Sequence, residues 1–163
     1  MDKLWSPWRM EYIRSKENKD EGCVFCIKSN ENDDRDNLVL FRGKTSFVLM
    51  NYYPYNNGHI MVCPYKHVEE TESLSKQSLT EIMELADKSM KIFRNTIKAQ
   101  GFNFGANIGV SGGAGIADHI HFHVVPRWVG DTNFMPVFSH TKVMVDGLLE
   151  TYDKLKIEFD KLK

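Results

Sequence analysis

The sequence predicts a single domain of the α+β class: an antiparallel sheet of about five strands, one long helix that crosses it and a second helix near the C-terminus. Three observations support this prediction. Short β-prone runs alternate with turn residues between residues 38 and 64. A long helical pattern follows at residues 79–99, and residues 119–126 alternate between histidine and apolar side chains before ending in Pro126.

Length and charge exclude several classes of protein. The chain has 163 residues, enough for one substantial core, and its formal net charge of −1 disfavours binding to a nucleic-acid backbone. It contains no apolar run near the roughly 18 residues that span a bilayer, and its N-terminus lacks a signal-peptide core. We therefore expect a cytoplasmic protein that contacts neither nucleic acid nor membrane. Its 3 cysteines disfavour a disulfide framework and favour thiol or metal chemistry.

The chain divides into three parts by composition. Residues 1–21 form an N-terminal arm, rich first in aromatic and then in charged residues, which we expect to cover a hydrophobic edge or to bring Trp8 or Arg9 to a ligand or partner. Residues 22–134 form the core, and residues 135–163 form a C-terminal extension. Within the core, the polar run at residues 28–37 predicts a solvated loop.

The first strands and the long helix follow this loop. Residues 38–42 and 46–51 predict a hairpin, and residues 59–64 a third strand, whose alternation places His59, Met61 and Cys63 on one face. The capping box Ser78-Leu79-Thr80-Glu81 predicts that the helix begins at Leu79, and Gly101 predicts its end. The apolar stripe of this helix is Leu79, Ile82, Met83, Ala86, Met90, Phe93 and Ile97.

The second half of the chain adds two strands and a helix. Residues 102–108 predict a fourth strand, and the glycine-rich loop at residues 109–115 leads into a fifth that begins at His119. Strand alternation puts His119, His121 and His123 on one face and apolar residues on the other. A last helix from about Gly147 carries one apolar stripe. That stripe is Leu148, Tyr152, Leu155, Phe159 and Leu162.

Two groups of residues indicate chemistry. Cys23 and Cys26 have the spacing of half a zinc site, which His67 and His119 could complete; two buried thiols without metal are the alternative. The glycine loop, directly before the histidine strand, can bring backbone N–H groups close to a phosphate, and an imidazole aimed at phosphorus is a competent nucleophile. A catalytic metal held by all three histidines of the strand is a rival, but it leaves both cysteines unexplained.

The run His119-Ile-His121-Phe-His123-Val-Val resembles the signature of the histidine triad superfamily of nucleotidyl hydrolases and transferases. The resemblance extends from Cys23 to about Phe134. The aromatic N-terminal run and the Gly-Ala-Gly loop look like the bacterial branch related to diadenosine tetraphosphate phosphorylases. The resemblance implies the histidine triad fold in one domain over residues 1–163, in a homodimer whose two sheets join edge to edge.

The resemblance also implies roles for individual residues. His121 attacks the α-phosphorus of a nucleotide and carries a covalent intermediate, His123 lies beside the phosphate, and His119 helps to place His121. Cys23, Cys26, His67 and His119 hold a structural zinc ion. The implied nucleotide-binding residues are Leu49 and Met61 at the base, Asn51 at the ribose, and Asn107, Gly112, Gly113, Ala114 and Gly115 at the phosphates.

One position departs from the family pattern. Other branches have a polar residue four positions before the first triad histidine, where it assists the leaving group; this chain has Gly115. The acceptor stays open between water, which makes a hydrolase, and inorganic phosphate, which makes a phosphorylase. The alternatives are a nucleoside phosphoramidate hydrolase and a nucleotide-binding regulatory module with little turnover. Trp128 is predicted either to pack under the loop that follows the triad or to stack on a second nucleotide.

Overall fold

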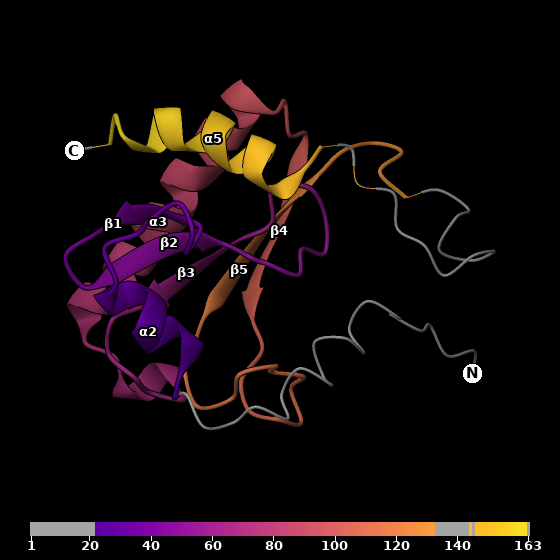
Figure 1. Cartoon of the computed structure of the whole chain (residues 1–163). Coiled ribbons are helices and arrows are strands. Elements are labelled where there is room, and N and C mark those ends of the chain that lie inside the picture. Colours follow the sequence, from indigo (N-terminus) through magenta and orange to yellow (C-terminus); the bar gives the residue numbers. More distant parts are fainter. Residues whose placement is uncertain (1–21, 133–143, 145, 163) are drawn as a thin grey trace, which may run out of the picture.

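The computed structural model describes residues 22–132, 144 and 146–162 (Figure 1). The N-terminal arm, with Trp8 and Arg9, lies outside the described residues, so its role stays a prediction, as does the division into arm, core and extension. The elements are α2 (Val24–Asn30), β1 (Val39–Arg42), β2 (Ser46–Met50), β3 (Ile60–Pro64), a 3₁₀ turn (Thr71–Ser73), α3 (Lys76–Thr96), β4 (Gly101–Ala106), β5 (Phe122–Arg127) and α5 (Leu148–Phe159).

The strands form one antiparallel sheet in the order β1-β2-β3-β5-β4, which confirms the predicted α+β class and five strands. Its register aligns a row of residues across the sheet. From β1 to β4 this row is Val39, Leu49, Met61, His123 and Gly105. Because paired residues point to the same face, the row joins apolar side chains on β2 and β3 to a triad histidine on β5.

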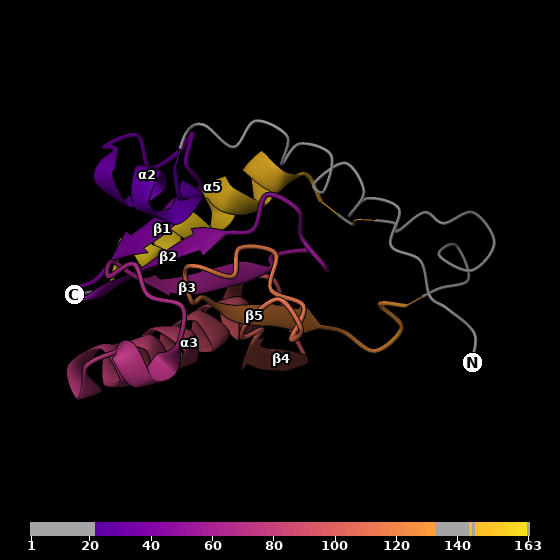
Figure 2. The same cartoon turned by 90° about the horizontal axis from the view of Figure 1, so that it is seen from below.

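One face of the sheet carries the main core. Helix α3 crosses this face (Figure 2), and α5 packs against α3 and β1. The core includes Ile60 and Val62 from β3 and Ile120 and Val124 from the triad run. The alternation read from the sequence is thus confirmed, since the residues between the histidines are buried on the helical side.

The opposite face is covered near β1 and β2 by the short helix α2 (Figure 2). A second apolar cluster forms there around Phe25, with Leu49, Met61 and Cys63 among its buried members. None of the helices in the described part of the chain is long and apolar enough to cross a membrane.

Three local predictions were wrong. Helix α3 begins at Lys76, because the Ser75 hydroxyl accepts the Ser78 N–H and caps the helix one turn earlier than expected. Glu81 is therefore no capping residue; its carboxylate accepts the backbone N–H groups of Lys44 and Thr45 and ties the β1–β2 turn to α3.

The buried stripe of α3 therefore differs from the predicted apolar stripe: Met83 is 54% exposed, and Leu85 is buried. The polar run at residues 28–37 begins inside α2, which extends to Asn30. The strand of the triad begins at Phe122, so His119 and His121 precede its first paired residue.

Candidate active site and metal cluster

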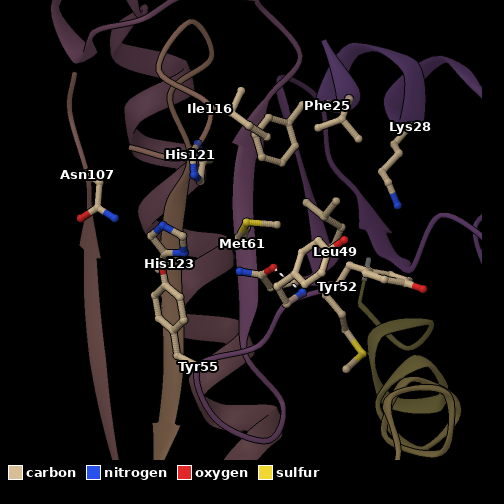
Figure 3. A pocket seen from close by; sticks show the side chains of 15 residues that line it. Phe25, Lys28, Leu49, Tyr52, Tyr55, Met61, Asn107, Ile116, His121 and His123 are labelled. Atoms are coloured by element: carbon tan, nitrogen blue, oxygen red, sulfur yellow. Dashed lines mark hydrogen bonds between the residues drawn. The ribbon is translucent and has the colours of Figure 1, made fainter. Parts of the chain in front are cut away.

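A pocket opens on the α2 side of the sheet, and two triad histidines lie in its wall (Figure 3). Residues from α2, β2, β3, β5 and the loops β2–β3 and β4–β5 contribute to it. The lining residues are Val24, Phe25, Lys28, Leu49, Met50, Asn51, Tyr52, Tyr53, Tyr55, Met61, Asn107, Gly115, Ile116, His121 and His123. Segments far apart in sequence thus meet where the row of Leu49, Met61 and His123 crosses the sheet.

A backbone hydrogen bond fixes the orientation of His121 and the tautomer of its neutral ring. Its side chain is buried, and its Nδ1 lies 2.8 Å from the carbonyl oxygen of His119. Because a carbonyl only accepts, Nδ1 carries the hydrogen and Nε2 carries the lone pair. Burial lowers the pKa of His121, and the hydrogen bond to His119 only opposes this shift. The Phe25 ring packs 4.8 Å from the imidazole and fixes its plane. A neutral imidazole with a lone pair on Nε2 is the form that can attack phosphorus.

His59, a fully buried residue directly before β3, orients His123. The backbone N–H of Tyr55 donates to His59 Nδ1 at 3.0 Å, so the His59 hydrogen is on Nε2. That Nε2 lies 2.9 Å from His123 Nδ1 and donates to it. The hydrogen of neutral His123 is therefore on its own Nε2, which makes His123 a hydrogen-bond donor through that atom.

The predicted base and ribose residues all line the pocket. Leu49 and Met61 are opposite each other on β2 and β3, and Ile116 and Phe25 add further apolar surface. Asn51 lies just after β2, where its Oδ1 accepts the Tyr53 N–H at 2.9 Å. This apolar recess beside a polar amide suits a flat heterocycle joined to a sugar.

The predicted phosphate residues are only partly brought together. Asn107 and Gly115 line the pocket, but the other loop residues, Gly112, Gly113 and Ala114, are not among its lining residues. Gly113 has a φ of +86°, a conformation that glycine adopts without strain. The loop turns tightly at this point, since the Gly112 N–H donates to the Gly109 carbonyl.

The four predicted metal ligands form one cluster. The donor atoms of Cys23, Cys26, His67 and His119 all lie within 4.8 Å of one another. Cys23 Sγ lies 3.3 Å from His119 Nδ1, and Cys26 Sγ lies 3.4 Å from His67 Nδ1 and 3.6 Å from His119 Nδ1. Zinc–ligand bonds of roughly 2.0–2.3 Å give a tetrahedron with edges of about 3.5 Å, so this cluster could hold a metal ion.

Local structure prepares these ligands. Cys23 is the N-cap of α2 and Cys26 lies on its first turn, and this spacing brings the two thiols together. His119 Nε2 donates to the Pro64 carbonyl at 2.9 Å, which leaves Nδ1 free of hydrogen and directed at the cysteines. Burial and the neighbouring Cys23 raise the pKa of the Cys26 thiol, which disfavours its thiolate form. A bound cation would reverse this effect.

The HIT domain model matches residues 32–129, which is more than half of the chain and includes the triad. The chain belongs to the HIT domain family. This confirms the resemblance to histidine triad proteins that the sequence indicates.

Relatives of this HIT domain chain include an "AP-4-A phosphorylase" of Mycobacterium tuberculosis, 36% identical over 98% of this chain and 85% of the relative. A "Bis(5'-adenosyl)-triphosphatase" of Dictyostelium discoideum is 28% identical to this chain, over 57% of this chain and 62% of the Dictyostelium protein. Among solved structures, a zinc-bound histidine triad family protein from Mycobacterium smegmatis has a TM-score of 0.67 at 20% identity, covering 86% of this chain and 94% of that one. This likeness supports the same fold.

Sequence reasoning missed several residues of the site in this HIT domain. His59 was placed on the face of Met61, but its partnership with His123 depends on the register between β3 and β5. Lys28 and Phe25 were missed because the α2 helix was not predicted. Trp128 packs against the main core and donates its indole N–H to the Ile97 carbonyl at 3.1 Å, which favours the predicted packing role.

Proposed function

We propose that this HIT domain protein cleaves dinucleoside polyphosphates, such as diadenosine tetraphosphate, at the α-phosphate through a covalent nucleotidyl intermediate on His121. The observation that carries the proposal is the position of His121, whose Nδ1 donates a hydrogen bond to the His119 carbonyl, in the wall of a pocket with an apolar recess. The names of the relatives, a phosphorylase and a triphosphatase of adenosine polyphosphates, support this substrate class.

The reaction has two displacements. His121 Nε2 forms a bond to the α-phosphorus while the bond from phosphorus to the bridging oxygen breaks, and that oxygen leaves with its electron pair. His123, through its Nε2 hydrogen, stabilises the charge on the phosphate oxygens. An oxygen of water or of inorganic phosphate then attacks the same phosphorus and the bond to His121 breaks; water gives its proton to the medium.

The remaining predicted residues bind the nucleotide. Leu49 and Met61 hold the base, Asn51 the ribose hydroxyls, and Asn107 with the loop from Gly112 to Gly115 the phosphates. The positions of Leu49, Asn51, Met61, Asn107 and Gly115 in the pocket wall support these roles. Gly115 offers no side chain to the leaving group, so a backbone N–H of the loop, a water molecule or a residue from elsewhere would take that part.

The cluster of Cys23, Cys26, His67 and His119 would hold a structural zinc ion. The mixed sulfur and imidazole donor set, with all four donor atoms within 4.8 Å of one another, supports zinc. With four protein ligands the ion would have no open position, so it would stabilise the fold around His119 and take no part in the chemistry. The 3 free cysteines fit a reducing compartment, and a cytoplasmic location would be checked by cell fractionation.

A homodimer would form along β4. This strand is at the edge of the sheet, and Asn103, Phe104 and Gly105 are exposed there. An uncovered edge strand is a template for pairing with a second chain, so two copies would join their sheets at this edge.

The test is incubation with diadenosine tetraphosphate, with and without inorganic phosphate, and chromatography of the products. ATP plus ADP that form only with phosphate establish phosphorolysis, whereas ATP plus AMP without phosphate establish hydrolysis. Nucleotide binding without turnover under either condition would contradict the proposal and leave a regulatory binding module.

A further inference from the structure

Lys28 is the only lysine or arginine among the described residues that line the pocket. It lies on α2 four residues after Val24, so both side chains point from the helix toward the pocket. The Lys28 side chain is half-buried and lies on the opposite side of the pocket from Asn107 and His123 (Figure 3).

The ammonium group of Lys28 is held in place near one acidic residue: burial lowers the pKa of Lys28, and the negative charge of Glu31 opposes that shift. Its Nζ donates to the Asn37 carbonyl at 3.1 Å, and among the described residues no carboxylate lies within ion-pair distance of it. An ammonium has three N–H groups, so two remain for a ligand.

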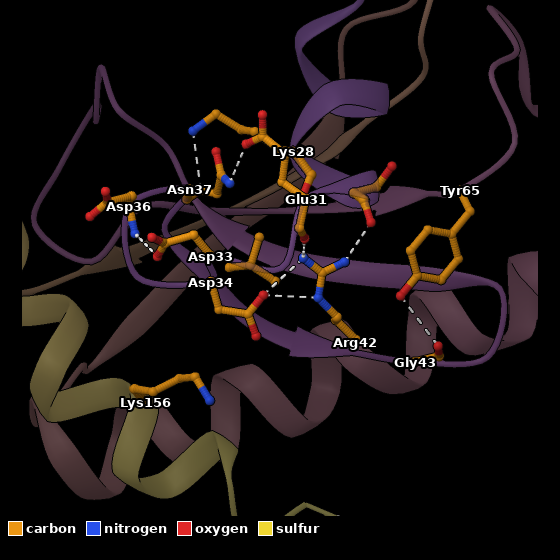
Figure 4. Close-up of polar contacts among 12 residues, drawn as sticks. Lys28, Glu31, Asp33, Asp34, Asp36, Asn37, Arg42, Gly43, Tyr65 and Lys156 are labelled. Atoms are coloured by element: carbon orange, nitrogen blue, oxygen red, sulfur yellow. Dashed lines mark hydrogen bonds and ion pairs between the residues drawn. The ribbon is translucent and has the colours of Figure 1, made fainter.

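The helix that carries Lys28 is fixed to the sheet by Arg42 (Figure 4). The Arg42 guanidinium donates to the Ser29 carbonyl at 2.6 Å and to the Glu31 carbonyl at 2.7 Å, and it pairs with Asp34. These bonds satisfy carbonyls at the C-terminal end of α2, which would otherwise lack partners. Lys28 is thus presented from a rigid support.

The sheet register separates Lys28 from the reacting phosphorus. Neighbouring strands are about 4.8 Å apart, so His123 on β5 lies about 14 Å from Val39, its counterpart on β1. Lys28 binds Asn37, two residues before Val39, and so lies at the β1 side of this row. A phosphate beside His123 is out of its reach, whereas the outer edge of a base resting on Leu49 and Met61 is within it.

The geometry points to Lys28 as the residue that reads the base, by donating hydrogen bonds to acceptors on the outer edge of a 6-oxopurine such as guanine. This inference rests on the proposed function and adds a base preference to it. Guanine presents two adjacent acceptors, O6 and N7, whereas adenine presents N7 beside an amino group that would face the ammonium as a competing donor.

The experiment compares kcat/KM for diguanosine and diadenosine tetraphosphate in the wild type, Lys28→Met and Lys28→Arg. We expect Lys28→Met to lower the guanine-to-adenine ratio of kcat/KM about tenfold, which is within the discrimination that a bidentate side-chain contact to the guanine edge provides. Lys28→Arg keeps the donors and should keep most of the preference. Lys98→Met is the matched control, because Lys98 is exposed and likewise donates to a backbone carbonyl, that of Asn95.

Binding of GMP and AMP, measured by calorimetry in the same variants, tests the inference independently of turnover. One outcome is that the wild type cleaves neither substrate yet still binds GMP more tightly than AMP, with Lys28→Met abolishing that preference. In that case the proposed function fails, and the role of Lys28 in recognising the base is supported. An equal loss for both bases in Lys28→Met, or no change in their ratio, would overturn the role of Lys28.

Discussion

At the residue scale, the site depends on which nitrogen of each imidazole carries a hydrogen. The His119 carbonyl fixes this for His121, and the Tyr55 N–H fixes it for His59 and, through His59, for His123. Backbone groups therefore fix the hydrogen positions of the proposed nucleophile and the proposed donor before any substrate binds, and such preorganisation favours electrostatic catalysis.

The first prediction concerns His121. His121→Asn removes the nucleophilic nitrogen and should lower kcat by about 10³-fold or more, since no other pocket imidazole has its lone pair so placed. Nucleotide affinity and metal content should stay at wild-type levels, as checked by calorimetry and elemental analysis. If this variant lost its metal, His121 would be implicated as a ligand, and the assignment of that role to His119 would be wrong.

The second prediction concerns His59, which acts through His123. His59→Phe keeps the volume but removes the donor to His123 Nδ1, so kcat should fall about 100-fold with little change in KM. His59→Gln can accept from Tyr55 and donate to His123, and it should restore much of the rate. Equal rates for both variants would show that His59 only fills space.

At the element scale, α2 and the segment after β3 meet at the metal cluster. Cys26→Ser should abolish stoichiometric zinc binding and lower the free energy of unfolding by about 3 kcal/mol at saturating zinc, because the metal binds the folded chain only. Elemental analysis and urea unfolding measure both effects. Cys63→Ala is the control, since Cys63 is fully buried outside the cluster. The Cys63→Ala protein should still bind zinc. Zinc retained in Cys26→Ser would refute the ligand set.

Helix α5 is joined to β1 by one buried hydroxyl. Tyr152 donates to the Val39 carbonyl at 3.0 Å, and burial raises the pKa of Tyr152 to about 12 from 10.0. Between these values the unfolded chain loses a proton that the folded chain keeps, so stability should fall as pH rises from 10 toward 12. Urea unfolding of Tyr152→Phe should lack this part of the pH dependence and show a loss of about 1 kcal/mol at neutral pH. A wild-type stability that is flat over this range would contradict the prediction.

The elements that the sequence predicted well have strong periodicity. The alternation around His121 and the stripe of Tyr152, Leu155 and Phe159 both appear in the structure as buried faces. The start of α3 was misplaced because Ser75 and Ser78 are both competent caps, and only tertiary contacts give Glu81 another role. Helix α2 was missed because a seven-residue helix has little periodicity, and the contacts of Arg42 that fix its end come from β1.

At the scale of the whole molecule, the exposed edge of β4 is the surface on which the proposed dimer depends. Phe104→Glu should weaken the proposed dimer at least about tenfold, because two acidic groups and the lost apolar contact oppose pairing of the edges. Sedimentation velocity over a concentration series measures this. Ile157→Glu is the control, since Ile157 is 62% exposed on α5, which packs against α3 and β1. A wild-type protein that sediments as a monomer would refute the dimer.

The two-residue period of the triad run has a consequence for how such chains can diverge. Ile120 and Val124 face the core while His119, His121 and His123 face the other way, so one inserted or deleted residue between 119 and 124 would exchange the two sets. Histidines would enter the core and aliphatic residues the pocket, so folding and chemistry would fail together. Evolution can therefore exchange side chains along this run but not change its length, and differences in length among relatives should fall in loops such as residues 109–115.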